Sequence, residues 1–467
     1  MNRKEIILFS LSPIAASALG LLTVPAIAWV FQPEDIGRIS IFQSIAALLL
    51  FVSVLGLDQA YMREFFSCKD KISLLRSCLL PGVYLLIIIS IISLFFLPQL
   101  SVFIYSEDDQ LPLLLTIFVA FANHALRFST ISLRFDGRGF SYFMILVFPK
   151  ILQLALIGLV FEVVDRKEFT HLIGISFLTT IFAFLIGAWT TRDRWYVHCE
   201  NKMSYIQRWQ LFKFGYPLLL SSLAFWGLSS TSIYALSKIS TLNELALYSV
   251  TVSFAGIAVA FQTIVSTLFF PIIYKHLSDG GNVNRIEEVH RQVVAMICAI
   301  IVLYGTFSWL TEFMLPAQYV RIKYMLVCCA LQPLFYVLSD VTSLGVNMTR
   351  KTKLTLLITF TAMLLNIALC IELVPDYGAD GAVFANAISF FFLFVARTEA
   401  GARVWIKFPR KKMYLQIFFI FCLSVLTMAF GSKSYIHISI IWGALIPIIV
   451  IMFRREWLQI FRMIHHG

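Results

Sequence analysis

Charged residues are scarce in this chain. Asp, Glu, Lys and Arg make up 13% of its 467 residues, whereas 59% are apolar and 44 are Phe. Soluble proteins carry about 25% charged residues, so the composition excludes an ordinary soluble domain and a disordered chain. Only eight residues are Cys. None falls in a segment that we expect to face an oxidising compartment, and therefore no disulfide is expected.

Sequence motifs of enzymes are also missing. The chain has no G-x-x-x-x-G-K-[ST] phosphate loop, no H-E-x-x-H metal-binding helix and no G-x-S-x-G nucleophile elbow. The connections between its apolar runs are too short to fold a separate catalytic domain. The sequence therefore predicts no catalytic residue, no metal site and no cofactor.

Fourteen apolar runs fill nearly all of the chain instead. A helix needs about 20 mostly apolar residues to cross a hydrocarbon core of ~30 Å, and each run is close to that length. We predict an all-α polytopic membrane protein with about 14 transmembrane helices, at residues 8–30, 39–61, 75–97, 111–133, 142–161, 169–190, 212–236, 245–274, 293–315, 324–347, 354–374, 379–398, 414–431 and 436–453.

Lys and Arg are concentrated on one side of this topology. Of the 37 basic residues, 28 fall on the side that holds both termini, 7 fall on the other side, and Arg127 and Lys150 lie within runs. By the positive-inside rule, both termini are cytoplasmic. The net charge of +11 mostly reflects this asymmetry, so it does not indicate nucleic-acid binding.

The first twelve runs divide into two sets of six. The turn at residues 34–40 can be laid over residues 243–249, so that acidic, small and serine positions coincide at equivalent points of the two sets. We expect an N-terminal six-helix bundle at 1–195, a cytoplasmic connecting segment at 196–212, a C-terminal six-helix bundle at 213–403, and an additional helix pair with a cytoplasmic tail at 404–467. The two bundles would be pseudo-symmetric and surround a central cavity, as in many transporters.

Polar residues within the runs indicate which helix faces meet this cavity. Asn123, Arg127 and Arg134 share one face of the fourth run, and Gln332, Tyr336 and Asp340 share one face of the tenth. A charge that faces lipid at mid-bilayer costs about 2.5–3.5 kcal/mol, so these faces should meet protein or water. The predicted substrate-binding residues are basic, amide and aromatic: Arg63, Asn123, Arg127, Arg134, Lys150, Lys213, Trp226, Gln332 and Tyr336.

Two buried acids complete the predicted site. We expect Asp58 and Asp340 to balance charge or to couple transport to an ion, and either a proton or a sodium ion could serve. An alternative for both acids is hydrogen bonding between helices. For Arg63, Arg134 and Lys213 the alternative is snorkelling to the cytoplasmic interface.

Four segments, taken in order, resemble the bacterial polysaccharide or O-antigen flippases of the multidrug, oligosaccharidyl-lipid and polysaccharide exporter superfamily. They are residues 32–37 (QPEDIG), 56–63 (GLDQAYMR), 214–218 (FGYPL) and 373–382 (LVPDYGADGA), the last of which follows Asn366. The resemblance covers about residues 1–400. The chain departs from it at residues 232–236 (SIYAL), where many members have an Asp followed by a basic residue, and at residues 29–30, where a basic residue is common.

The resemblance implies a flippase for an undecaprenyl-diphosphate-linked oligosaccharide, such as an O-antigen unit of lipopolysaccharide. It would move this substrate by alternating access from the cytoplasmic to the periplasmic leaflet of the bacterial inner membrane. A diphosphate cannot cross hydrocarbon bare, whereas Arg or Lys can hold it in a wet cavity while the polyprenyl tail stays in lipid. Membrane lipid and other polysaccharide-assembly proteins are the further expected partners.

Two other functions stay open at this point. A multidrug antiporter of the same superfamily would prefer an acidic cavity that attracts organic cations. A membrane polysaccharide polymerase or ligase usually has a large external loop, which this chain lacks.

Overall fold

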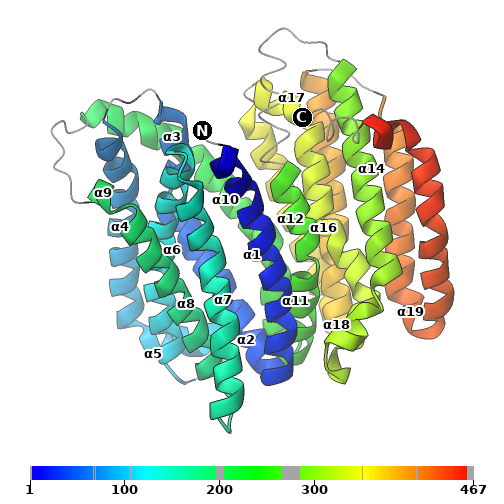
Figure 1. Cartoon of the computed structure of the whole chain (residues 1–467), viewed down its shortest axis with the longest axis horizontal. Helices are drawn as coiled ribbons and strands as arrows, with labels where there is room; N and C mark the ends of the chain where they lie inside the picture. The colour runs from blue at the N-terminus through cyan, green and yellow to red at the C-terminus, as the bar shows by residue number, and fades with distance from the viewer. Residues whose placement is uncertain are drawn as a thin grey trace. The chain divides into compact units, whose positions relative to one another are not determined.

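Every regular element that the structure describes is a helix (Figure 1). This computed structural model describes residues 3–66, 68, 70–105, 108–195, 204–265, 284–349, 351–405 and 409–459. Within them, 11 helices are long and apolar enough to cross a membrane, or 12 if α11 (Leu242–Phe254) and α12 (Gly256–Ile264) form one bent span. The chain is therefore an all-α, multi-pass membrane protein, as its composition predicts.

The chain forms two compact units. Unit 1 comprises Met1–Ser237 and Thr241–Ala246, and unit 2 comprises Lys238–Ser240 and Leu247–Gly467. The expected boundary at residues 196–212 differs from this division, because most of α10 (Tyr205–Ile239) belongs to unit 1. Residues 196–203 of the expected connecting segment lie outside the described residues. The division into two six-helix bundles, a connecting segment and a helix pair stays a prediction.

Close backbone contact holds α10 in unit 1. Gly215 lies against Gly56, and a Cβ at Gly215 would come within 2.8 Å of the carbonyl oxygen of Leu55. About three turns further on, the indole N–H of Trp226 donates to the carbonyl of Ser44 at 3.0 Å. Glycine permits this approach because it has no side chain.

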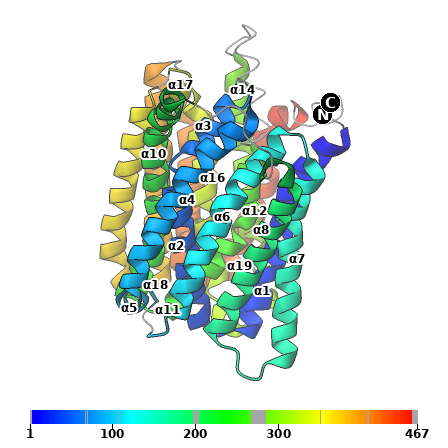
Figure 2. The ribbon, with the colours of Figure 1, turned by 90° about the vertical axis from the view of Figure 1, so that its left-hand side faces the viewer.

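Unit 1 is built on antiparallel membrane-length helices. They are α1 (Arg3–Val30), α2 (Pro33–Val54), α4 (Lys71–Phe95), α6 (Leu111–Phe135), α7 (Gly139–Val163) and α8 (Phe169–Thr190), with the shorter α3 (Leu57–Glu64), α5 (Leu97–Tyr105) and α9 (Arg192–Trp195) between them. Figure 2 shows α4, α6 and α8 side by side. Helix α1 runs along α7, and the Glu5 carboxylate accepts hydrogen bonds from the backbone N–H groups of Gly139 and Phe140 at the start of α7.

The second predicted run is broken in the structure. Residues 39–61 were expected to form one helix, but α2 ends before Leu55 (φ 54°) and Gly56 (φ 69°), and α3 begins after them. Two successive residues in the left-handed region cannot continue a right-handed helix. This turn changes the direction of the chain just before Asp58, which becomes the second residue of α3.

A buried histidine fixes the orientation of α6. His124 is 1% exposed, and its ring nitrogens lie 2.9 Å from the Ser53 hydroxyl on α2 and 3.0 Å from the Leu79 carbonyl on α4. Phe128, one turn later, is fully buried in the same core. Because residues three apart lie on adjacent parts of a helix surface, this packing leaves Arg127 at the edge of the buried face.

Unit 2 is organised around α16 (Ile322–Thr342), which is buried along most of its length. The helices packed on it are α14 (Asn284–Phe307), α18 (Thr352–Val404) and α19 (Lys411–Met452). Three short elements connect them: α15 (Leu310–Met314), the 3-10 helix η2 (Ala317–Tyr319) and α17 (Leu344–Met348).

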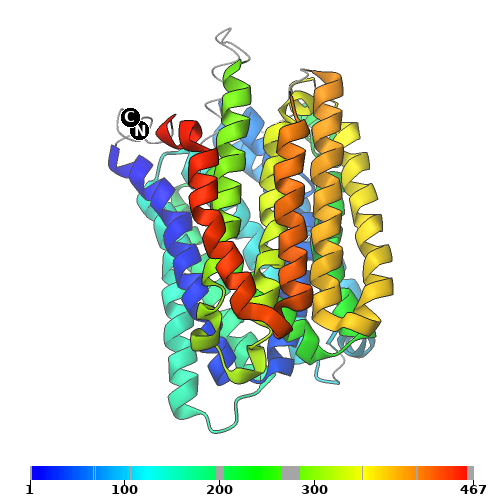
Figure 3. The same ribbon diagram turned by 90° about the vertical axis from the view of Figure 1, so that its right-hand side faces the viewer.

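The two longest helices fold back on themselves (Figure 3). Helix α18 is interrupted at Gly378 (φ 54°, ψ −127°), and α19 is interrupted at Ser434 (φ −143°, ψ 38°). These breaks fall in the connections expected at residues 375–378 and 432–435. The total of 14 spans stays a prediction, because the 11 or 12 candidate spans include α18 and α19 once each.

The C-terminal helix pair is packed into unit 2. Trp442 of α19 is fully buried, and its indole N–H donates to the Thr427 hydroxyl at 2.9 Å. Its ring lies against Gly305 of α14, where any larger residue would overlap it. The pair is thus held by side-chain interlocking with α14 as well as by contact with α16.

Candidate substrate-binding site

The predicted basic face of α6 centres on an ion pair in unit 1. Arg127 donates from Nε and Nη2 to Oδ2 of Asp58, at 3.0 and 2.6 Å. The other carboxylate oxygen of Asp58 accepts from the backbone N–H of Gln59 at 2.8 Å. The Asp58 side chain is 9% exposed and that of Arg127 is 43% exposed. The buried carboxylate therefore holds a cation whose remaining N–H donors are accessible.

Other predicted residues on α6 lie beside this pair. Asn123 is half-buried and Arg134 is exposed. Thr130 donates from its hydroxyl to the carbonyl of Arg127 at 2.9 Å, which satisfies the hydroxyl within the helix. In the part of the chain that the structure describes, Arg134 makes no ion pair. This face of α6 consequently carries more positive than negative charge.

Lys150 is a second cation without a carboxylate among the described residues. It is half-buried on α7, and its Nζ donates to the side-chain oxygen of Gln153 at 3.2 Å. The amide oxygen accepts one of the three N–H donors of a protonated lysine and neutralises none of its charge. Lys150 thus adds to the positive character of unit 1.

Arg63 and Lys213 lie on different helices of the same unit. Both are exposed. The guanidinium of Arg63 stands 4.6 Å from the ring centre of Phe214 on α10, and its Nε is 3.3 Å from the Glu64 carboxylate. Lys213 precedes Phe214 on α10, so the predicted basic residues of α3 and α10 occur on two helices that are in contact.

Trp226, another predicted substrate-binding residue, lies on α10. Its indole N–H is used by the backbone of α2, and its ring makes an edge contact with Tyr234 at 5.7 Å. The hydrogen bond joins α10 to α2, and the ring contact lies within α10. They leave the ring as the part of Trp226 that could meet a ligand.

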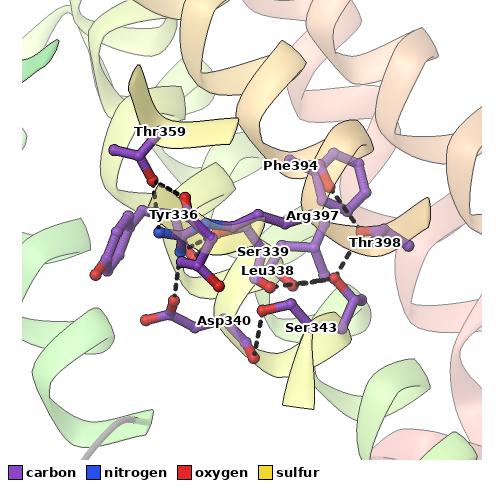
Figure 4. Close-up of polar contacts among 11 residues, drawn as sticks. Tyr336, Leu338, Ser339, Asp340, Ser343, Thr359, Phe394, Arg397 and Thr398 are labelled. Carbon is purple, nitrogen blue, oxygen red and sulfur yellow. Dashed lines mark hydrogen bonds and ion pairs between the residues drawn. The ribbon is translucent and has the colours of Figure 1, made fainter. Parts of the chain in front are cut away.

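Asp340 in unit 2 has its own partner. Arg397 of α18 donates from Nη1 to Asp340 Oδ1 at 2.9 Å, and from Nη2 to the Thr359 hydroxyl at 3.1 Å (Figure 4). Its guanidinium also lies 5.5 Å from the ring centre of Tyr336. Arg397 is buried, at 7% exposure, whereas the side chain of Asp340 is 24% exposed. The charge of Asp340 is thus balanced within unit 2.

Arg397 is not among the predicted site residues, and it lies one residue before the end of the helix expected at residues 379–398. The expected helix ended at residue 398, whereas α18 continues to Val404. The small residues Gly401 and Ala402 were the available signal, because Gly401 approaches the backbone of Thr342 so closely that a Cβ would lie 2.8 Å from its carbonyl oxygen. A helix that continues in contact with α16 buries Arg397 against Asp340.

Gln332 belongs to a buried amide network in unit 2. Asn386 donates to the side-chain oxygen of Gln332 at 3.2 Å and to the Tyr248 hydroxyl at 2.7 Å. Asn366 donates to Asn386 at 3.1 Å. Asn366 and Asn386 are almost completely buried. These bonds join α11, α16 and both limbs of α18, so Gln332 contributes to helix pairing.

The predicted site residues of unit 1 provide hydrogen-bond donors and positive charge. Among the described residues, no group of three or more His, Cys, Asp or Glu side chains could hold a metal ion. The polar groups of unit 1 are Arg, Lys and amide donors, which suit an anion or a hydroxyl-rich ligand.

The fold is one seen in multi-pass membrane transporters. No protein-family model matches the chain, and no curated protein matches its sequence. Solved structures of transporters do match it over nearly their whole length, at identities that show the fold alone.

One of these structures is the lipid II flippase MurJ in an inward closed conformation. It has a TM-score of 0.66 and 16% identity, and the match covers 96% of this chain and 99% of that one. An inward-facing multidrug resistance MATE family transporter of the MOP superfamily has a TM-score of 0.58 and 14% identity, covering 85% and 97%. A MOP superfamily transporter from Pyrococcus furiosus, described as having a binding pocket of reverse polarity, has a TM-score of 0.51 and 16% identity, covering 86% and 95%.

Proposed function

We propose that this protein is a flippase for an undecaprenyl-diphosphate-linked oligosaccharide. It moves an O-antigen unit or related glycan from the cytoplasmic to the periplasmic leaflet by alternating access. Arg127 contacts the diphosphate, Arg134 and Lys150 form the cytoplasmic entrance, and Asp58 positions Arg127. No covalent chemistry is involved.

The asymmetric exposure of the Arg127–Asp58 pair carries this proposal. A carboxylate that is 9% exposed and a guanidinium that is 43% exposed present a positive surface to a ligand. Arg forms two parallel hydrogen bonds with phosphate, and Nη1 of Arg127 is not used by Asp58. A diphosphate would meet this donor together with Arg134, for which the described residues provide no ion-pair partner.

The same observation argues against a multidrug antiporter. An organic cation requires accessible carboxylates or electron-rich aromatic faces. Asp58 is 9% exposed and is paired with Arg127, and the charge of Asp340 is balanced by Arg397. The half-exposed charges of unit 1 that the structure describes near Arg127 are cationic.

Orientation in the inner membrane follows from the distribution of basic residues. We propose that both termini are cytoplasmic and that the connection between α5 and α6 is periplasmic. In intact cells, a membrane-impermeant maleimide should label Asp108→Cys and should not label Lys353→Cys until the cells are permeabilised. Labelling of Lys353→Cys alone in intact cells would reverse the proposed direction of transport.

The proposed activity is tested by following lipid-linked glycan in cells that lack the protein. The glycan should accumulate on the cytoplasmic side, and the wild-type protein should restore its export. Arg127→Lys should restore part of the export, because a point charge keeps the attraction and loses the two-pronged geometry. Arg192→Ala is the matched control, because it removes a cation that lies over the ring of Trp189 and is not a predicted site residue. Cells with this variant should export the glycan normally. Normal glycan distribution in the deletion strain would reject the proposed function.

A further inference from the structure

A polar cavity lies in unit 1 between α3 and the first turns of α10. Its volume is about 490 Å³, within the range of about 300–1,000 Å³ typical of small-ligand pockets. Helix α3 contributes Ala60, Arg63 and Glu64 to its wall. The cavity is separate from the Arg127–Asp58 pair, because neither of these residues lines it.

The spacing of residues on α10 produces the opposite wall. Gln207, Gln210, Leu211 and Phe214 line the cavity, and they are three, four and seven residues apart, which places them on one helix face. Leu211 is 6% exposed, whereas both glutamines are exposed. The cavity thus has an apolar base and two amide groups at its mouth.

Another face of the same segment suits the membrane interface. Ile206, Trp209 and Tyr216 are 69%, 61% and 61% exposed and recur at helical spacing. Exposed aromatic side chains at the end of a transmembrane helix anchor it at the headgroup level. The glutamine face is therefore held at the depth where a glycan attached to a membrane lipid begins.

The cavity wall is electrically balanced. Nε of Arg63 lies 3.3 Å from the Glu64 carboxylate, and the guanidinium also lies over the ring of Phe214. A free phosphate would be repelled by Glu64, and an organic cation would be repelled by Arg63. The side-chain oxygen of Gln207 accepts from the backbone N–H of Ser204 at 3.0 Å, so Gln207 mainly offers its NH₂ donors, whereas Gln210 offers both donors and an acceptor. Arg63 and Glu64 together also offer donors and acceptors. Neutral hydroxyl groups match this set.

We infer that this cavity binds neutral sugar residues of the lipid-linked glycan and selects the glycan at the cytoplasmic end of unit 1. The inference rests on the proposed function. Asp58 and Arg63 are five residues apart on α3, or about 7–8 Å at 1.5 Å per residue. A substrate whose diphosphate meets Arg127 can therefore extend its first sugars toward the cavity.

Cys68 provides a reporter because it lines the cavity and is half-buried. In a Cys199→Ser, Cys422→Ser background, the cysteines that remain besides Cys68 are the five buried ones. The rate of maleimide labelling of Cys68 is measured on the purified full-length protein. Three probes are compared: oligosaccharide released by mild acid from the polyprenyl-linked glycans of the producing cell, inorganic pyrophosphate, and tetraphenylphosphonium.

The released oligosaccharide should slow labelling by roughly tenfold at ten times its dissociation constant, because the unprotected fraction falls as 1/(1 + [L]/Kd). The double variant Gln207→Leu, Gln210→Leu should lose this protection while its labelling rate without ligand stays unchanged, which shows that the cavity is intact. Gln59→Leu is the matched control, since Gln59 is exposed on α3 and does not line the cavity; it should keep full protection.

Protection by pyrophosphate alone or by tetraphenylphosphonium alone would overturn the inference, as would equal labelling with all three probes. These results are distinguishable from failure of the proposed function. Normal glycan export in the deletion strain rejects the flippase even if the oligosaccharide protects Cys68. Lost export in that strain without protection of Cys68 rejects the sugar site alone.

Discussion

Substitution of Arg127 should have separable effects on stability and on transport. Removing one partner of a fully buried ion pair costs about 3–5 kcal/mol, because a charge is left without compensation. Arg127 is 43% exposed and water reaches it, so we expect about 1–2 kcal/mol for Arg127→Ala. A change of this size should lower the Tm of the purified protein by about 1–2 °C, because the entropy of unfolding is about 1 kcal/mol/K for a chain of 467 residues.

The double variant Asp58→Asn, Arg127→Gln isolates the effect on transport. It removes both charges and lets the two amides hydrogen-bond, so its Tm should return to within about 0.5 °C of the wild-type value. Export of lipid-linked glycan should still be lost, because no guanidinium remains for the diphosphate. The assays are thermal unfolding in detergent and glycan export at matched protein level. Wild-type export by the double variant would refute the role of Arg127 in binding.

Three further predictions concern helix packing in the two units and one exposed ion pair. Gly215→Val should prevent normal folding, because a Cβ there would overlap the backbone before α3, and this is measured as loss of monodisperse protein in size-exclusion chromatography. The ring of Trp442 is fully buried, so Trp442→Ala should lower the free energy of unfolding by about 3–5 kcal/mol, and Trp442→Phe should lower it by less. Thermal unfolding measures both changes. Hydrogen bonds from Arg138 lower the pKa of Asp193 in the folded protein. The pair therefore stabilises the fold fully above the ordinary Asp pKa of about 4. This stabilisation is lost as the pH falls through the lowered pKa of Asp193. Asp193→Asn should reduce that acid sensitivity slightly, because both side chains are nearly half exposed.

The lengths of the apolar runs predict the membrane helices, because a segment that crosses the bilayer must form its backbone hydrogen bonds internally. The breaks within them are less predictable. The turn at Leu55 and Gly56 places a leucine in the left-handed region, which local sequence disfavours and tertiary contact with α10 compensates. The start of α10 was expected near residue 212, because polar residues such as Gln207 and Arg208 lower the hydropathy of a segment that is nevertheless helical from Tyr205.

The basic face of α6 could be predicted because residues three and four apart share a helix surface. The partner of Arg127 could not, because Asp58 is 69 residues away in sequence. Arg397 was missed for a similar reason: its burial depends on the path of α18 beside Asp340 and not on its neighbours in sequence. Gln332 was expected to meet substrate, and its bond with Asn386 could be found only from the fold.

Transport by the purified protein tests the central claim most directly. The protein is reconstituted in proteoliposomes that contain a fluorescent undecaprenyl-diphosphate oligosaccharide, and loss of its outer-leaflet fluorescence to an impermeant reductant is followed. Wild-type protein should make nearly all of the labelled lipid accessible, and the Asp58→Asn, Arg127→Gln variant should leave the inner-leaflet half protected. Protection of the inner-leaflet lipid with wild-type protein, together with uptake of an organic cation such as ethidium by the same vesicles, would contradict the proposed function.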